Sequence, residues 1–165
     1  LEELDFVEKY SGLSKKKSKK VHEVLRKVII SGEWRDIYKV IRKLQYRIGM
    51  PYEKAELIAR TELARIINKA KELGYKNKTR VEKFRWVTRD RNACDKCKSL
   101  AKWTREESRT LEEIKEKLKE LGGDPEGLIV HPNCRCTITR ASGYLKHDFE
   151  YEKNPSGQIP PRTNI

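Results

Sequence analysis

The longest amphipathic pattern in the chain lies in residues 52–74, YEKAELIARTELARIINKAKELG. Its apolar side chains recur at intervals of three and four residues, the spacing that places them on one face of an α-helix. Gly74 follows the last apolar residue, as is common after a helix. We therefore predict a helix from about Tyr52 to Leu73 with Gly74 as its stop.

Similar apolar stripes precede this stretch. One covers residues 21–29 and is closed by Ser31-Gly32, and another covers residues 34–48 and is closed by Gly49 and Pro51. A shorter pattern at the start of the chain predicts an opening helix that ends at Ser11-Gly12, followed by a lysine-rich run. Consecutive helices with short breaks predict a helical half over residues 15–75.

The pattern changes after residue 75. Val81–Thr88 is rich in β-branched and aromatic residues and predicts a strand, and Leu128–Val130 and Thr137–Thr139 are short strand candidates that flank a loop. Between them, residues 105–121 predict a charged helix with a capping box formed by Thr110 and Glu113. The fold class we expect is α+β, with a predominantly helical N-terminal half and a small β-region.

The chain of 165 residues is long enough for one domain. We expect an N-terminal segment over residues 1–14, a domain over 15–153 that divides into a helical part (15–75) and a basic strand and Cys/His part (76–153), and a proline-containing flexible tail over 154–165. No run of 18 apolar residues is present, so we expect no membrane-spanning helix and no membrane partner. We expect no secretory signal, because no apolar h-region with a cleavage site is present in the opening residues.

Positive charge dominates the first part of the chain. Lys and Arg number 38 against 25 Asp and Glu, a net charge of +13, and residues 1–100 carry the whole excess. Such a surface attracts polyanions, and nucleic acid first among them. Abundant Lys, Glu, Arg and Ile with one Met are typical of a thermophile.

All four cysteines fall within 43 residues, as Cys94-x-x-Cys97 and Cys134-x-Cys136, with His131 shortly before the second pair. Two close pairs of this kind can direct four S or N ligands at one ion, so we predict a structural Zn²⁺ held by four of these five residues. Arg135 lies between two of them and is expected to hydrogen-bond the ligands or their backbone. Basic neighbours (Lys96, Lys98 and Arg135) are expected to lower the thiol pKa values. Disulfides, a redox CxxC and free buried thiols are the alternatives.

Several of these motifs occur together in one known family. The order ISGEWRDIYKVIRKL, AELIARTELARIINKAKELGY, FRWVTRDRNACDKCKSLAKW and HPNCRC resembles the phage Mu F-like family of minor head (head-morphogenesis) proteins. The resemblance covers about residues 30–140, and its helical motif falls on Ala59, Arg60, Thr61, Glu62 and Asn68. Further matching positions are Trp86, Asp90, Cys94, Cys97, His131, Pro132, Cys134, Arg135 and Cys136. Family members commonly have an L-x-G turn after the first Cys pair, where this chain has Ser99-Leu100-Ala101-Lys102 and the charged helix.

The resemblance implies a component of a tailed-virus or provirus head. Its partners would be portal and capsid proteins and packaged DNA, and its location the head interior, after a period in the host cytoplasm before assembly. We expect no enzymatic activity, because no Ser/His/Asp set, phosphate loop or acidic constellation is present. The alternatives are a zinc-containing, sequence-nonspecific nucleic-acid-binding module and, behind it, a nuclease-like effector that uses the His131/Cys cluster.

Two groups of polar residues have competing interpretations. One interpretation is a polar face toward DNA or a partner, formed by Arg60, Arg65 and Asn68. The other is that Arg60 or Glu62 pairs with the strand region and holds the two halves together. We favour the second interpretation. DNA contacts led by phosphates are predicted for the basic strand segment and its aromatics. The residues assigned to these contacts are Lys83, Arg85, Arg89 and Arg91.

Overall fold

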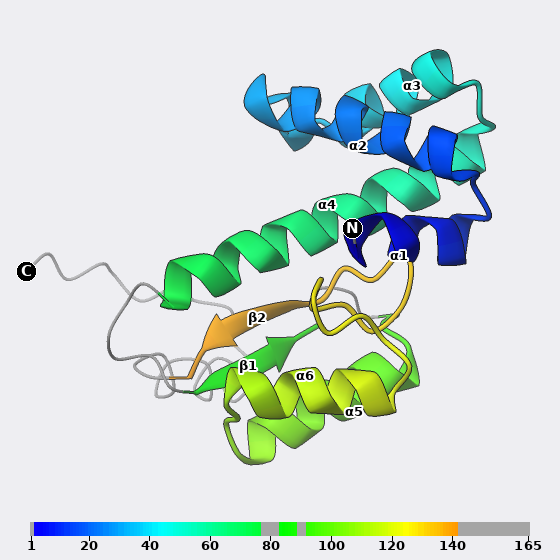
Figure 1. Cartoon of the computed structure of the whole chain (residues 1–165). Coiled ribbons are helices and arrows are strands. Elements are labelled where there is room, and N and C mark those ends of the chain that lie inside the picture. The colour runs from blue at the N-terminus through cyan, green and yellow to red at the C-terminus, as the bar shows by residue number, and fades with distance from the viewer. Residues whose placement is uncertain (1, 77–82, 89–91, 142–165) are drawn as a thin grey trace, which may run out of the picture.

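A computed structural model describes residues 2–76, 83–88 and 92–141 of the chain. The predicted tail (154–165) and the residues Arg89 and Arg91 lie outside this part. The chain forms a helical lobe and a second lobe that contains the sheet, and the long helix α4 (Tyr52–Lys76) runs between them (Figure 1). The structure is mostly helical with a two-stranded sheet, so the predicted α+β class is confirmed.

The helical lobe follows the predicted stripes. Its other elements are α1 (Glu2–Ser11), α2 (Lys15–Ile30), the 3-10 turn η1 (Glu33–Arg35) and α3 (Ile37–Ile48). α2 starts within the lysine run, earlier than its apolar stripe. α3 starts after Trp34, because the Asp36 side chain accepts hydrogen bonds from the backbone N–H groups of Tyr38 and Lys39 and caps the helix there.

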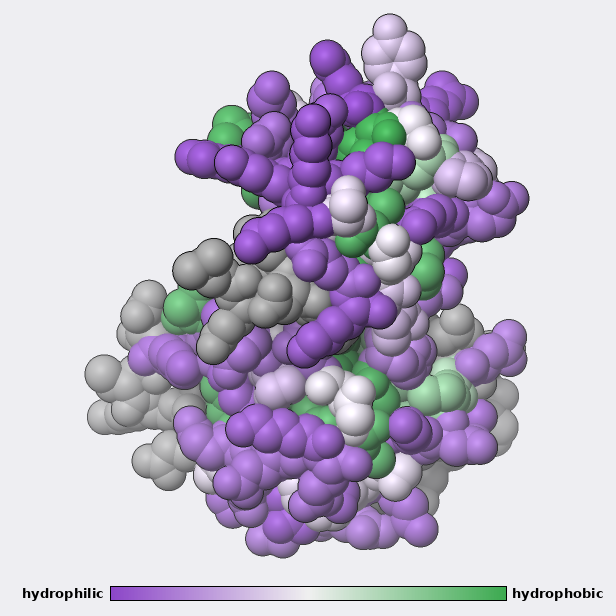
Figure 2. Space-filling model, turned by 45° about the vertical axis from the view of Figure 1, so that its right-hand side comes forward, coloured by the Kyte–Doolittle hydropathy of each residue, from purple (hydrophilic) through white to green (hydrophobic). Residues whose placement is uncertain are grey.

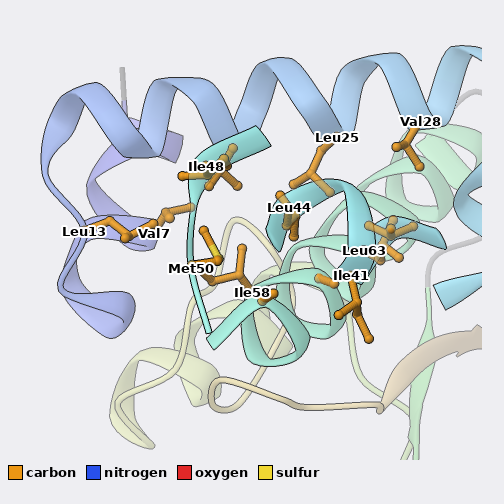
Figure 3. Close-up of a cluster of buried hydrophobic side chains, with 14 residues drawn as sticks. Val7, Leu13, Leu25, Val28, Ile41, Leu44, Ile48, Met50, Ile58 and Leu63 are labelled. Atoms are coloured by element: carbon orange, nitrogen blue, oxygen red, sulfur yellow. The ribbon is translucent and has the colours of Figure 1, made fainter. Parts of the chain in front are cut away.

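Apolar side chains of all four helices meet in one core (Figure 3). Leu25, Ile41, Leu44 and Ile58 are among the largest fully buried side chains. Val7 of α1 is also fully buried, so the opening helix packs into the same core as the rest of the lobe. Burial of a Leu or Ile side chain contributes about 1.5–3 kcal/mol, so this core is the main apolar contribution to the stability of the lobe.

The predicted stop at Gly74 is wrong, because α4 continues through this glycine to Lys76. Gly74 does not adopt the left-handed conformation that usually ends a helix. Glu72 also pairs with Lys76, one turn on (2.9 Å), and the Tyr75 ring packs against Phe84 at 5.3 Å between centroids. The ion pair supports the last turn of the helix, and the ring contact holds this turn against the second lobe.

The second lobe is built on an antiparallel pair, β1 (Phe84–Val87) with β2 (Thr137–Arg140), in which Trp86 lies opposite Ile138. β1 is shorter than the predicted strand, and Val81 and Glu82 lie outside the described residues. Two helices complete the lobe, α5 (Asp95–Glu106) and α6 (Leu111–Glu120), and the predicted capping box of Thr110 and Glu113 opens α6. A separate core joins these elements.

Two expectations for this lobe are corrected. The predicted helix over 105–121 is α6 alone, because residues 95–106 form the separate helix α5. Leu128–Val130 is not a strand: Leu128 has a left-handed backbone (φ 50°), which breaks the extended run and leaves one isolated bridge between Asp124 and Ile129. The candidate Thr137–Thr139 is confirmed within β2.

Candidate metal centre

The predicted Cys/His cluster is present in the second lobe. Its sulfur and nitrogen atoms come from the first turn of α5 and from the loop that precedes β2. They form two overlapping groups, within each of which all ligand atoms lie within 4.8 Å of one another. The groups are Cys94, Cys97 and His131, and Cys97, Cys134 and Cys136. Cys97 belongs to both, so it lies at the centre of the cluster.

Two distances in this cluster match the edges of a zinc tetrahedron. Cys97 Sγ lies 3.8 Å from Cys134 Sγ and 3.4 Å from His131 Nε2. Zn–S bonds of about 2.3 Å and Zn–N bonds of about 2.0–2.1 Å at tetrahedral angles separate ligand atoms by roughly 3.5–3.8 Å. All four cysteines are free in the structure. The cluster can therefore hold a metal ion.

The orientation of His131 favours coordination through Nε2. Its Nδ1 lies 2.7 Å from the carbonyl oxygen of Pro132. A carbonyl only accepts hydrogen bonds, so Nδ1 must carry the proton that is donated to it. Nε2 then carries the lone pair, and it faces Cys97. Histidine ligands of zinc are commonly fixed in this way by a carbonyl behind the ring.

Cys94 differs from the other thiols because it is exposed, whereas Cys97, Cys134 and Cys136 are buried. Cys94 is also the N-cap residue of α5. The solvent-facing side of the site therefore has one exposed thiol, and the other side is closed by protein.

The three buried thiols cannot all ionise unaided. The pKa of Cys97 is raised by its hydrogen bonds with Cys134 and Cys136 and by burial, and the hydrogen bond with Cys134 raises the pKa of Cys136 to about 11. Hydrogen bonds from Cys136 and Cys97 lower the pKa of Cys134. One thiolate is thus stabilised by two thiols, and a bound cation would release the remaining protons. Lys96 Nζ donates a hydrogen bond to the carbonyl of Leu121 (2.8 Å).

Helix α4 holds the ligand loop in place. Thr61 Oγ1 accepts a hydrogen bond from the backbone N–H of Asn133 (2.8 Å), directly before Cys134. Asn68 Nδ2 donates to the carbonyls of Leu128 (2.8 Å) and Cys136 (3.2 Å). Asn68 Oδ1 accepts from the Thr137 hydroxyl (2.7 Å), and the Asn68 residue is 1% exposed. These bonds fix the backbone on both sides of the second Cys pair.

A buried ion-pair network ties α4 to the loop that follows α6. Arg65 Nε donates to Asp124 Oδ2 (2.6 Å) and Arg65 Nη1 to Glu62 Oε2 (2.8 Å). The Tyr10 hydroxyl of α1 donates to the other Glu62 oxygen (3.0 Å). Burial raises the pKa of Glu62 against the opposing effect of Arg65. The network thus connects both lobes through one arginine.

Gly127 makes room for this network. A methyl group at Gly127 would lie 2.6 Å from Arg65 Nε and would also clash with the Asp124 carboxylate. Neither Asp124 nor Gly127 was singled out from the sequence. Asp124-Pro125 follows two glycines, which indicates a turn but gives no sign that its carboxylate binds an arginine of α4.

The remaining predicted site residues that the structure describes are partly or fully exposed. Arg60 pairs with Glu56 one turn earlier (2.8 Å), on the half-exposed side of α4, and does not join the lobes. Arg135 is exposed. Of the residues assigned to DNA, Lys83 is exposed and Arg85 is half-buried at the start of β1.

The fold and the cluster define a class of small α+β protein in which a long polar-faced helix supports a Cys/His lobe. The model of one family, the phage Mu protein F-like proteins, matches residues 19–139, and the chain belongs to this family. Neither the curated proteins nor the solved structures returned a match. In the described part of the chain, no helix is both long and apolar enough to cross a bilayer.

Proposed function

We propose that the chain is a head-morphogenesis protein of a tailed virus or provirus, located in the virion head with portal and capsid proteins and with packaged DNA. The family match over residues 19–139 carries the proposal, because it includes α4 and all five candidate ligands. The net charge of +13 supports proximity to DNA. A thermophilic host remains a prediction from composition.

Mass spectrometry of purified virions tests this role. Heads from an induced provirus or a lytic infection should contain the chain together with the portal protein, and a tagged chain should retain the portal protein on affinity purification. A chain that stays in the host lysate, with none in DNA-filled heads, would contradict the proposal. Genes for portal and terminase proteins beside this gene would support it.

We also propose that the metal is Zn²⁺ and that its role is structural. The distances from Cys97 Sγ to Cys134 Sγ and to His131 Nε2, the thiol-rich ligand set and the orientation of His131 support zinc. Purified protein should contain one zinc per chain by elemental analysis. A chelator should remove it with loss of structure in the second lobe. Protein without metal and with no titratable thiols would instead contain disulfides.

The proposal assigns no catalytic step to the cluster, since His131 Nε2 faces Cys97 as a ligand would. Incubation of the protein with DNA and added divalent cations should leave the DNA intact. Cleavage that persists through purification and disappears in His131→Ala would identify a nuclease-like effector. DNA binding without any association with heads would identify the other alternative, a free nucleic-acid-binding module.

A further inference from the structure

The positive charge is concentrated in one helical hairpin. Residues 15–48, which form α2, η1 and α3, contain twelve basic and three acidic residues, a net charge of +9 out of +13. Two of the three acids are paired within the hairpin, Glu33 with Lys43 and Asp36 with Lys39. On the face shown in Figure 2, the lobe that contains the hairpin is covered largely by hydrophilic side chains. Residues 77–141, which include the basic strand, carry a net charge of +5, so the hairpin holds the larger share of the excess.

The solvent face of α3 combines this charge with exposed aromatic rings. Tyr38, Arg42 and Tyr46 follow one another at intervals of four residues, on the side opposite the buried stripe of the helix. Tyr38 is 62% exposed and Tyr46 is 87% exposed. Arg42 and the neighbouring Arg47 have no acidic partner among the residues that the structure describes. α3 itself contains no acidic residue.

Guanidinium and phenol groups both donate hydrogen bonds to phosphate oxygens. Side chains four residues apart on a helix are separated by about 6 Å along its axis, so the three residues present a row of donors. The apolar side chains of α3 other than its two exposed tyrosines point into the core, and the dense charge of the face differs from the centre of a protein–protein interface, which is depleted in charged residues. A polar, strongly basic surface is typical of interfaces with DNA.

We propose that the outward face of α3, with the lysine-rich start of α2 beside it, is the docking surface for the phosphate backbone of duplex DNA. This inference rests on the proposed association with packaged DNA and places the contact on the hairpin rather than on the basic strand. Tyr38, Arg42, Tyr46 and Arg47 contact phosphates, and the α2 lysines add long-range attraction. Binding is insensitive to base sequence.

Affinity for a random-sequence duplex, measured against salt concentration, tests the surface. The full chain is compared with the double variant Arg42→Ala/Arg47→Ala and with Lys98→Ala/Lys102→Ala, which removes the same charge from the exposed face of α5. The α3 variant should lower the slope of log K against log salt by roughly two and weaken binding at least about tenfold at 0.1 M salt. The α5 variant should change affinity less than about twofold.

Tyr38→Phe/Tyr46→Phe removes the hydroxyl groups without changing charge. We expect binding at least about threefold weaker, in line with the loss of hydrogen bonds to a charged acceptor. Equal effects of the α3 and α5 variants, or unchanged binding in the tyrosine variant, would overturn the proposal. A loss confined to Lys83→Ala would place the contact on the strand and overturn it too. Incorporation of the chain into heads is measured separately. Failure of the DNA-binding tests would therefore overturn the assignment of this surface and leave the proposed head-morphogenesis function standing.

Discussion

Asn68 and Thr61 show what the polar residues of the family motif do at the scale of single side chains. Both lie on the buried face of α4, and both bond to the backbone of the segment that contains the second Cys pair. In the described part of the chain, their hydrogen bonds go to backbone groups and to the Thr137 hydroxyl rather than to sulfur or imidazole atoms. Their role is to hold the loop so that Cys134 and Cys136 face Cys97, which makes them positioning residues for the metal.

Replacement of Asn68 by alanine should destabilise the protein by about 2–3 kcal/mol, because the carbonyls of Leu128 and Cys136 lose their buried donor. Zinc should also transfer to a competing chelator faster than in the unmodified chain, and this second readout separates positioning from simple loss of stability. Arg60→Ala, on the half-exposed side of the same helix, is the control and should change both quantities little. Equal zinc transfer in the two variants would contradict the assigned role.

The candidate ligands could be predicted from the sequence, because CxxC and HPNCRC bring their ligands together by local spacing. The partners of Asn68 could not, because they lie 60 and 68 residues further along the chain. Arg65 could be placed on the face shared with Thr61 and Asn68. Its pairing with Asp124, by contrast, is decided by how the loop folds back onto α4.

At the scale of elements, periodic apolar residues predict the helices well and their ends less well. α5 lies outside the predicted helices, although Cys97, Leu100, Ala101 and Thr104 have helical spacing and are all buried. The sequence draws attention to this segment as a cysteine motif that departs from the L-x-G turn of the family, and not as a helix. Leu128–Val130 has the composition of a strand, but tertiary contacts override it, since Leu128 is left-handed and fully buried.

Glu72 joins α4 to α6 and gives this junction a pH dependence. Its carboxylate pairs with Lys76 (2.9 Å), with Lys115 of α6 (3.1 Å) and with Lys69 (3.1 Å). Burial alone would raise the pKa of Glu72, but the three lysines outweigh it and lower the pKa to about 2. A carboxylate with a lowered pKa in the folded state adds stability above its unfolded pKa, and this stability is lost as the pH falls through the folded value.

We therefore expect Glu72→Gln to lower the free energy of unfolding at pH 7 by up to about 3 kcal/mol. Denaturant unfolding of the variant and of the unmodified chain measures this difference. The difference should shrink between about pH 4.5 and pH 2, as Glu72 is protonated in the unmodified chain. Comparison of the two chains at each pH cancels the loss of zinc in acid, which affects both. A difference that stays constant down to pH 2 would show that the ion pairs do not stabilise the junction.

At the scale of the whole molecule, the two lobes have separate apolar cores and meet along the polar face of α4. The helical lobe contains none of the candidate ligands. In the described part of the chain, the second lobe consists of a two-stranded sheet and two short helices around the cluster. So little secondary structure gives the lobe little stability of its own. A metal ion at Cys97 would join α5 to β2 and complete this lobe.

Removal of the metal should consequently loosen one lobe before the other. After chelation, amide hydrogen exchange should rise at least about tenfold in α5 and β2 and change little in α2 and α3. Cys97→Ala should reproduce this pattern without chelator. A uniform rise in exchange along the chain would mean that the two lobes unfold as one unit.

X-ray absorption at the zinc edge of the purified protein tests the central claim most directly, because it counts the atoms bound to the metal. Three sulfur ligands at about 2.3 Å and one nitrogen ligand at about 2.0–2.1 Å are expected, with the nitrogen supplied by His131. His131→Ala should remove the nitrogen signal. A shell of oxygen and nitrogen atoms without sulfur, or protein that binds no zinc, would contradict the account.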